Sequence, residues 1–499
     1  MSKYINILEE KIKEVFLELG YNKEIEIKNS DRPELSDYQC NNALQLAREY
    51  KKSPQIIAKE VLQSLEKKSY FKEYFENVSV DGPGFINFKL SKEFVAKQLD
   101  SIKDSEKVGF EPLKNPLTVI VDYAGMNVAK IMHVGHLRAS IIGEAIVRLS
   151  RFMGNKTIGD AHLGDWGTPM GMVIAEIQER QPNLPYFDKN FKGEYPKESP
   201  VTVDELIEIY PTASKKRKED EVYAEKCQDF TFRLQKKERG IYELWKKFRE
   251  VSVEDFKRVE NELNVDIDLW YGESDADDAV NFLIDDLKKK GFVVESQGAQ
   301  VIMLDEYKLN ENDIPPFMMI KSNGTIKYET TDLGTIYNRV KDFNPDKILY
   351  VVDQRQELHF IQVFGAADKT GICSKDKLEH LGFGTVNGKD GKPFKTRDGG
   401  VATLQSMIDL TYEEAKKTVE TSSKNENLSK EEKEEIAKIV SLAAIKFADL
   451  SNYRMADYIF TPEKFTSFEG KTGPYILYTI VRIKSILNKI EKQKNDKII

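Results

Sequence analysis

Apolar and polar positions along the chain follow two periods, one typical of strands and one typical of helices. A β-branched run begins at Val119 and ends in Val121-Asp122-Tyr123, as expected for the buried first strand of a parallel sheet. After a loop, Gly154-Asn155 can end the next helix in a left-handed turn. That helix is predicted from apolar residues at helical spacing: Leu137, Ile141, Ile142, Ala145, Ile146 and Leu149. A strand followed by a helix is the opening unit of an open α/β sheet.

The same periods predict how the later part of the chain is organised. Between Gln181 and Tyr271 the sequence becomes polar, with a loop and then a long, highly charged helix over 203–263. Such a segment is expected as an insertion between two halves of one sheet. The second half of that sheet is predicted at 300–304, 317–320, 325–328 and 348–352, and further helices at 431–453 and 475–490. The expected fold is α/β, with a Rossmann-like, nucleotide-binding parallel sheet and a helical C-terminal segment.

Residues 1–112 are predicted to form a separate α+β unit. Its first helix is amphipathic and is closed by Gly20, and another starts at Ser53-Pro54, where proline fits the first turn. The first helix is expected at 5–19, a second follows Tyr38 and runs through Ala47, and a third begins at Pro54. Strands are expected at 75–80 and 85–90. A linker over 109–116 separates this unit from the sheet.

Composition narrows the class of protein. A chain of 499 residues is too long for one core, so two or three domains are expected. No apolar run of about eighteen residues or signal-peptide core is present, which favours a soluble, cytoplasmic protein without a membrane partner. The three scattered cysteines, Cys40, Cys227 and Cys373, are interpreted as reduced, buried thiols.

The formal net charge of −8 does not exclude a nucleic-acid partner, because 75 basic residues can still form a local strip. Lys215-Lys216-Arg217-Lys218 and Lys236-Lys237-Glu238-Arg239 are the candidate strips. The alternative is that each is a solvated helix face.

A histidine pair stands where the first strand turns into the helix. The free N–H groups and the dipole at a helix N-terminus favour an anion. His133 and His136 can present donors to a phosphate there, and Gly135 leaves room for a flat ring against the backbone. These features predict a phosphate-bearing nucleotide. The alternative is a pair of surface or metal-binding histidines, but no suitable third ligand lies nearby.

Three further patches carry polar chemistry. The segment from Asp160 to Gly167 is a glycine-containing loop after the second strand, and Asp353 to His359 follows the strong strand 348–352. The segment from Phe383 to Gly400 holds Lys389, Lys392 and Lys395 among glycines, and such a loop could close over a triphosphate. Its alternative is a solvated surface hairpin.

Together these motifs resemble arginyl-tRNA synthetase, a class I aminoacyl-tRNA synthetase. The signature segment runs Met126, Asn127, Val128, Ala129, Lys130, Ile131, Met132, His133, Val134, Gly135, His136, and His162-Leu163-Gly164-Asp165-Trp166-Gly167 follows. The resemblance implies an arginine–tRNA ligase that activates L-arginine with ATP and transfers it to tRNA(Arg). It also implies Mg²⁺ carried by ATP, no dedicated protein metal site, activation that usually waits for bound tRNA, and a cytoplasmic monomer.

The substrate can be argued from charge, and the resemblance supplies the other roles. A guanidinium has donors that a fixed carboxylate accepts in pairs, and Asp332, supported by Tyr328, is the predicted carboxylate; its alternative is a helix N-cap. By resemblance, the catalytic residues are His133, His136, Lys130, Lys392 and Lys395. The predicted ATP ligands are His133, Gly135, His136, Gly164, Asp165, Trp166, His359, Lys389, Lys392 and Lys395. The predicted arginine ligands are Asp122, Asn127, His133, Tyr328, Asp332 and Gln356.

The resemblance also suggests domains. Residues 1–112 are similar to a module that contacts the tRNA elbow, where Phe85 would stack on a base and Asn87 would bond it; the alternative for Phe85 is a core position. Residues 113–455 would be the catalytic domain with the insertion at 182–271, and 456–499 the start of a helical anticodon-binding domain. The sequence stops before that domain's pattern is finished. A truncated chain, a shortened gene and a second polypeptide all stay open.

The chain departs from the family pattern at a few positions. Met126 replaces a frequent proline, Pro169-Met170 replaces Gln-Phe, and Lys392-Pro393-Phe394-Lys395-Thr396 is a degenerate form of the usual lysine motif. Two rival interpretations remain: another class I ligase or a nucleotidylyltransferase, which would have no need of Asp332, and a non-catalytic RNA-binding paralogue.

Overall fold

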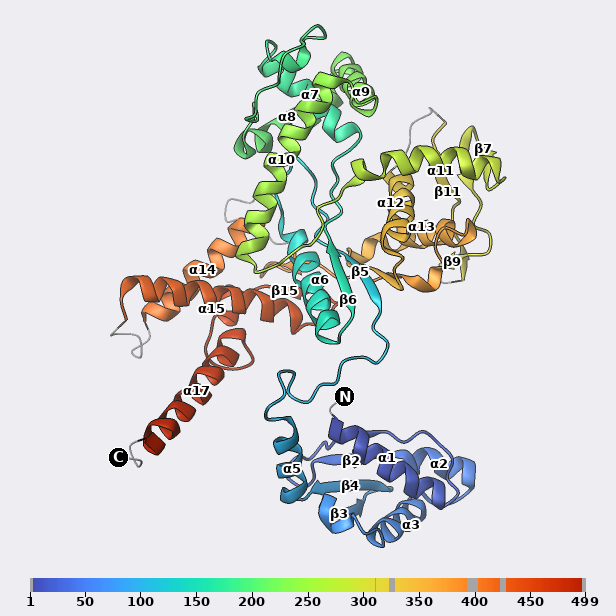
Figure 1. Ribbon diagram of the computed structural model, residues 1–499, viewed down its shortest axis with the longest axis vertical. Helices are drawn as coiled ribbons and strands as arrows, with labels where there is room; N and C mark the ends of the chain where they lie inside the picture. The colour runs from blue at the N-terminus through green and yellow to red at the C-terminus, as the bar shows by residue number, and fades with distance from the viewer. Residues whose placement is uncertain (1–2, 310, 323–327, 393–402, 422–427, 496–499) are drawn as a thin grey trace. The chain divides into compact units, whose positions relative to one another are not determined.

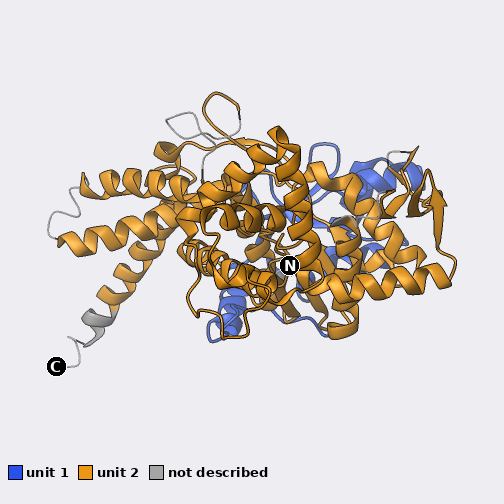
Figure 2. Cartoon of the chain, turned by 90° about the horizontal axis from the view of Figure 1, so that it is seen from above, with its two compact units in different colours: residues 1–114 blue, residues 115–499 orange. Residues whose placement is uncertain are grey.

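A computed structural model describes residues 3–309, 311–322, 328–392, 403–421 and 428–495 of the protein. The chain divides into two compact units, Met1–Lys114 and Asn115–Ile499, which Figure 2 distinguishes by colour. No helix in the described ranges is both long and apolar enough to span a bilayer.

The first unit is an α+β fold around a four-stranded antiparallel sheet in the order β1-β2-β4-β3. Side chains alternate along β4 (Phe85–Leu90), where Ile86, Phe88 and Leu90 are buried. Both predicted strands are confirmed, while Tyr38–Cys40 proves to be a strand and not a helix. The remaining elements are α1 (Lys3–Glu18), β1 (Ile27–Asn29), β2 (Tyr38–Cys40), α2 (Asn42–Tyr50), α3 (Pro54–Glu66), α4 (Phe71–Tyr74), β3 (Phe75–Asp81) and α5 (Lys92–Ile102).

The second unit is built on a parallel sheet in the order β13-β12-β5-β6, which confirms the predicted Rossmann-like architecture (Figure 1). The helix α6 (Val134–Phe152) follows β5 and leads to β6, and Gly154 beyond it adopts a φ of +99°. Two strands of the sheet precede the insertion and two follow it. Their bounds are β5 (Thr118–Asp122), β6 (Lys156–Asp160), β12 (Lys347–Tyr350) and β13 (Leu378–His380).

The predicted charged helix over 203–263 is three helices, which pack with α7 (Thr168–Arg180) around their own core. In Figure 1 these helices form a green lobe beside the sheet. Thr202 and Glu205 form a capping box that starts the first of them. The elements of the lobe are the 3₁₀ turn η1 (Pro185–Phe187), α8 (Val203–Glu219), α9 (Glu221–Gln235) and α10 (Arg239–Glu262).

Two strands predicted for the parallel sheet belong elsewhere. Residues 299–302 and 317–320 form β8 and β11 of a separate antiparallel sheet, in the order β11-β8-β7. Apolar periodicity identifies a strand but not its neighbours, which explains the error. Of the predicted strand at 325–328, residues 325–327 lie outside the described residues, and Tyr328 opens a helix. The elements here are η2 (Glu273–Ala276), α11 (Asp277–Lys289), β7 (Val293–Ser296), β8 (Ala299–Ile302), β9 (Lys308–Leu309), β10 (Asn312–Asp313), β11 (Phe317–Ile320) and α12 (Tyr328–Phe343).

Beyond the sheet the chain is mostly helical. The predicted helices at 431–453 and 475–490 are confirmed as α15 (Lys430–Leu450) and α17 (Gly473–Asn495). Several apolar side chains of α17 are exposed, among them Ile476, Ile480 and Leu487. The other elements are η3 (Gln354–Gln356), α13 (Glu357–Lys369), η4 (Lys375–Lys377), β14 (Val386–Asn387), α14 (Leu404–Glu420), β15 (Tyr458–Ile459) and α16 (Pro462–Phe465).

Candidate active site

The histidine pair caps the N-terminus of α6. His133 Nδ1 accepts a hydrogen bond from the Gly135 N–H at 3.0 Å, and His136 Nδ1 accepts one from the His133 N–H at 3.0 Å. The two rings stack with their centroids 4.0 Å apart. Because each Nδ1 is an acceptor, each ring is neutral with its proton on Nε2. The pair therefore offers two Nε2–H donors at the positive end of a helix.

Their surroundings keep both rings neutral. Burial lowers the pKa of His136 to about 3, and burial together with the nearby Lys130 lowers the pKa of His133. A Cβ on Gly135 would lie 2.7 Å from His133 Cε1, so glycine is needed here for the capping ring to fold back. The sequence predicted that the space beside Gly135 takes a flat ring of the ligand. The ring of His133 occupies part of that space.

A tight turn leads into this cap. The Lys130 N–H donates to Asn127 O at 3.1 Å, and Ala129 in the turn has a φ of +61°, in the left-handed region that alanine rarely adopts. The ammonium of Lys130 lies 4.6 Å from the ring centroid of Tyr210 in α8. The turn also pairs with the second loop, since the Val128 N–H donates to Gly164 O. The signature segment is therefore held by the insertion and by the loop after β6.

The side chains of Asp165 and Trp166 are built into the scaffold. The Asp165 carboxylate is fully buried, 2.5 Å from Arg249 Nε, and it accepts from both the N–H and the hydroxyl of Ser274. Trp166 donates to Asp277 and packs on Trp245. Both positions were predicted as ATP ligands. These contacts hold both side chains within the scaffold.

An acidic slot lies at the start of α12. Asp332 Oδ2 is 2.6 Å from His359 Nε2, and Asp332 Oδ1 is 3.9 Å from His162 Nε2; the carboxylate keeps 23% of its exposure. Because α12 begins at Tyr328, Asp332 lies in its second turn, so the alternative role as an N-cap is wrong. The side chain of Tyr328 itself lies outside the described residues.

Glu273 and His162 belong to the same slot, and sequence reasoning missed both as site residues. Burial and the charge of Asp332 raise the pKa of Glu273 to about 8. The Glu273 N–H also donates to Leu163 O, directly after His162. No motif singles out Glu273, since it follows the long insertion. His162 stood within a quoted motif, and its position two residues after the end of β6 could have identified it.

Two other predicted arginine ligands differ in burial: Asp122 is buried and Gln356 is exposed. Asp122 is buried, and its carboxylate lies 2.7 Å from Arg339 Nη2, which also pairs with Asp160 at 2.5 Å. Arg339 thus already supplies a guanidinium to this second pair of acids. Gln356 is exposed just before α13, three residues from His359.

The lysine loop is anchored beside the histidine pair. Thr403, the first described residue after the loop, bridges to His133, and the Leu404 N–H donates to Met132 O at 2.8 Å. Lys389 is exposed and lies 3.0 Å from Glu463, and Lys392 is exposed. Lys395 lies outside the described residues. The loop therefore returns next to the site where a triphosphate was expected.

Comparisons with known proteins identify the family. The family described as "tRNA synthetases class I (R), catalytic domain" matches residues 99–461, and "Arginyl tRNA synthetase N terminal domain" matches residues 2–90. The chain is 50% identical over 493 residues to an arginine–tRNA ligase of Alkaliphilus oremlandii, covering 98% of this chain and 82% of that one. An arginine–tRNA ligase of Agathobacter rectalis is 48% identical over 502 residues, with 99% and 83% covered.

The chain belongs to the arginyl-tRNA synthetase family.

Arginyl-tRNA synthetases are class I ligases that activate L-arginine with ATP and transfer it to tRNA(Arg), and this chain is such an enzyme. A crystal structure of arginyl-tRNA synthetase from Plasmodium falciparum matches with a TM-score of 0.78 at 27% identity, covering 98% of this chain and 81% of that chain. The fold also matches the Thermus thermophilus arginyl-tRNA synthetase, with a TM-score of 0.69 at 23% identity, over 97% and 82% of the two chains. The chain thus spans about four-fifths of the length of these arginyl-tRNA synthetases.

The arginyl-tRNA synthetase N-terminal unit presents Phe85 and Asn87 on the face of β4 opposite its core. Both are half-buried, whereas Ile86, Phe88 and Leu90 point inward, so the alternative of a core Phe85 does not fit. The Asn87 amide donates to Asp81 at 2.8 Å. This outer face is where the sequence predicted contact with tRNA.

The candidate basic strips are partly engaged within the protein. Lys216 pairs with Glu176 and Glu179, and Lys237 lies 3.0 Å from Asp278. Arg239 donates to the carbonyls of Phe191 and Gly193. These contacts favour structural roles for the three residues named here.

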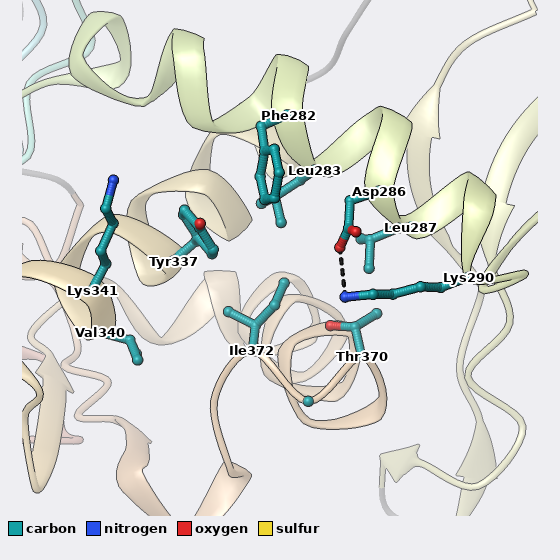
Figure 3. A pocket seen from close by; sticks show the side chains of 11 residues that line it. Phe282, Leu283, Asp286, Leu287, Lys290, Tyr337, Val340, Lys341, Thr370 and Ile372 are labelled. Atoms are coloured by element: carbon teal, nitrogen blue, oxygen red, sulfur yellow. Dashed lines mark ion pairs between the residues drawn. The ribbon is translucent and has the colours of Figure 1, made fainter.

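Figure 3 shows a hollow of about 380 Å³ elsewhere in the arginyl-tRNA synthetase fold, between α11, α12 and the end of α13. Phe282 and Tyr337 line it, and Asp286 pairs at 2.7 Å with Lys290, four residues further along the chain. It shares no residue with the slot around Asp332. Within the described residues, no three His, Cys, Asp or Glu side chains are grouped as a metal site.

Proposed function

We propose that the acidic slot of Asp332 and Glu273 binds the guanidinium of L-arginine, while the His133–His136 cap binds the phosphates of ATP. The observation that carries this proposal is the pair of carboxylates in the slot. Burial and the charge of Asp332 raise the pKa of Glu273 to about 8, so a positive charge bound beside these two acids would stabilise their ionised forms. A planar guanidinium supplies that charge and paired donors.

In the proposed reaction the arginine carboxylate attacks the α-phosphorus of ATP in line, and pyrophosphate leaves. No general base is required, because the nucleophile is already ionised, so positioning and charge stabilisation dominate. The two Nε2–H groups donate to phosphate oxygens at the N-terminus of α6. Lys130, Lys389, Lys392 and Lys395 add positive charge as pyrophosphate forms. In the second step, the terminal ribose hydroxyl of tRNA(Arg) attacks the arginyl carbonyl and AMP leaves.

The other assignments are part of the same proposal. Asn127, Tyr328 and Gln356 contribute further bonds to arginine. Asp122 also contributes to arginine binding, from its place beside Arg339. Gly135, Gly164 and His359, with the backbone at Asp165 and Trp166, border ATP. Mg²⁺ enters as part of the ATP substrate, bound by its phosphates.

We also propose roles for the domains. Residues 1–112 contact the tRNA elbow through Phe85 and Asn87, 113–455 carry catalysis with the insertion at 182–271, and 456–499 begin an anticodon-binding domain. The protein acts as a monomer in the cytoplasm, the compartment in which translation takes place.

Arginine-dependent exchange of pyrophosphate into ATP, measured with tRNA(Arg) present and each of the twenty amino acids in turn, tests the proposal. Arginine alone is expected to support exchange. Exchange with another amino acid, or tRNA binding without any exchange, would contradict it. Charging of tRNA by the 499-residue chain is compared with that by a version extended to the full length of its relatives.

A further inference from the structure

The helix α10 contacts both loops of the nucleotide site through one face. Trp245, Arg249 and Ser252 lie at helical spacing on it. The Trp245 indole donates to Asp165 O at 2.8 Å, and Arg249 Nε lies 2.5 Å from the Asp165 carboxylate. The Ser252 hydroxyl accepts from the Ala129 N–H at 3.1 Å and donates to Phe248 O at 2.8 Å. One helix of the insertion therefore bonds to the turn before the histidine cap and to the loop after β6.

The bond from Ser252 falls on the strained residue of the turn. Ala129 has a φ of +61° and is buried, so its N–H needs a partner within the protein. Ser252 is itself only 4% exposed and is held by its bond to Phe248. The next residue, Lys130, lies over Tyr210 of α8. The left-handed turn that leads to His133 is thus held by two helices of the insertion.

We propose that Ser252 is a positioning residue for adenylate formation: its hydroxyl holds the Asn127–Lys130 turn in the left-handed form that places Lys130 and His133 at the ATP phosphates. The inference rests on the proposed function of those two residues and adds a role for the insertion. Ser252 does not touch the reacting atoms. Without its hydroxyl, the turn would relax toward the conformations that alanine prefers. Lys130 and His133 would then shift from their proposed positions at the ATP phosphates.

The test compares variants of the full chain in arginine-dependent pyrophosphate exchange with tRNA(Arg) present. Ser252→Ala is expected to lower kcat on the order of tenfold, while the KM for arginine changes less than about twofold. Ser441→Ala is the matched control, because Ser441 is 5% exposed in α15 and its hydroxyl donates to Lys438 O of its own helix. It is expected to keep the exchange rate, and thermal unfolding of both variants monitors any loss of fold.

A second substitution separates positioning from a general packing defect. Glycine adopts a φ of +61° without strain, so Ala129→Gly added to Ser252→Ala is expected to recover at least about a third of the lost kcat. A packing defect at Ser252 would not respond to a glycine in the turn. The inference is wrong if Ser252→Ala exchanges as fast as Ser441→Ala, or if the added glycine restores nothing. If the unaltered chain shows no arginine-dependent exchange, the proposed function itself fails.

Discussion

His133 and His136 each bond the backbone through Nδ1, and the proposed function uses their Nε2–H groups as donors to ATP. This division follows from the cap, since a protonated Nδ1 could not accept the bond from Gly135 or His133. The lowered pKa values agree with it. The rings therefore act as neutral donors, and stability and catalysis at this site can be separated by substitution.

His133→Asn is expected to keep the fold and lose the reaction. Asparagine is among the best N-caps, so its side chain can accept the Gly135 N–H, but it has no group at the Nε2 position. We expect kcat for pyrophosphate exchange to fall about a hundredfold, by analogy with the loss of a single oxyanion donor. The unfolding temperature should stay closer to that of the unaltered protein than it does in His133→Ala. A variant with full activity would contradict the donor role.

Asp332→Asn is expected to weaken arginine binding far more than ATP binding. Removing one partner of a partly buried charge pair costs about 2–5 kcal/mol, or at least a thirtyfold rise in the KM for arginine. The KM for ATP should change by less than about twofold. Asp286→Asn serves as a control, since Asp286 is a comparably exposed helical aspartate in an ion pair with Lys290. Equal losses for both substrates would contradict the assignment.

Arginine binding is expected to depend on pH through Glu273. Below its pKa of about 8 this carboxyl carries a proton in the empty site, whereas a bound guanidinium favours the ionised form. Below this pKa, arginine binding must therefore release the proton of Glu273. The free-energy cost of that release grows as the pH falls. The Kd for arginine should drop up to about tenfold per pH unit between about pH 6.5 and 7.5 and level off above 8.

Glu273→Gln should remove this slope, which titration calorimetry in buffers of different ionisation enthalpy can follow. The histidine cap does not contribute, because His136 has a pKa of about 3 and that of His133 is also lowered. A flat profile in the unaltered protein would mean that Glu273 is ionised in the empty site.

Among the elements, α6 is tied to the C-terminal helices by one buried arginine. Arg138, directly after the signature helix begins, is 1% exposed and lies 2.9 Å from Asp449 of α15. It also donates to the carbonyls of Gly384 and Ala456. Gly384 stands just before β14, from which the lysine loop departs. The contact thus fixes the stem of that loop relative to the histidine cap.

Asp449→Ala is expected to destabilise the second unit by about 3–5 kcal/mol, because it leaves the Arg138 charge buried and unpaired. Urea unfolding of the full chain measures this. Asp278→Ala is the matched control, since Asp278 is 89% exposed in its pair with Lys237 and should cost less than about 1 kcal/mol. Similar small losses in both variants would show that Arg138 finds sufficient partners in the two carbonyls.

For the whole molecule, the division into two units has a direct consequence. The first unit has its own hydrophobic core, which includes Leu8, Phe16, Val61 and Phe88. A unit with its own core can fold alone. The interactions inside each unit should therefore be largely independent of the other.

A fragment of residues 1–114 is expected to fold by itself and to unfold in one cooperative transition. Circular dichroism during urea unfolding tests this, with the intact chain measured beside it. The Phe85→Ala form of the same fragment should unfold at a similar urea concentration, since Phe85 lies outside the buried core. A fragment without a cooperative transition would mean that its core needs the second unit.

Local patterns in the sequence were sufficient to predict many helices and strands, but not which strands pair with one another. The parallel strand 118–122 and the helix after it follow from periodicity and from stop signals at Gly154-Asn155. Strands 299–302 and 317–320 were found, but they were assigned to the wrong sheet, because a short apolar run carries no information about its neighbours.

The candidate site divides in the same way. His133, His136 and Asp332 could be selected from residue type, spacing and family resemblance. Glu273 could not, since it joins the slot only through the return of the chain after the insertion. Asp165 and Trp166 share a motif with the site, yet their side chains face the scaffold.

The sequence by itself determined the family, many of the helices and strands and the signature residues, because these depend on neighbours along the chain. Tertiary structure decided which charged groups meet: Arg339 pairs with Asp122 and Asp160, Asp332 lies beside His359, and the charge of Asp332 acts on Glu273. The physical reason is that charge interactions depend on distances in space, and the sequence fixes those distances only through the completed packing of helices and sheets.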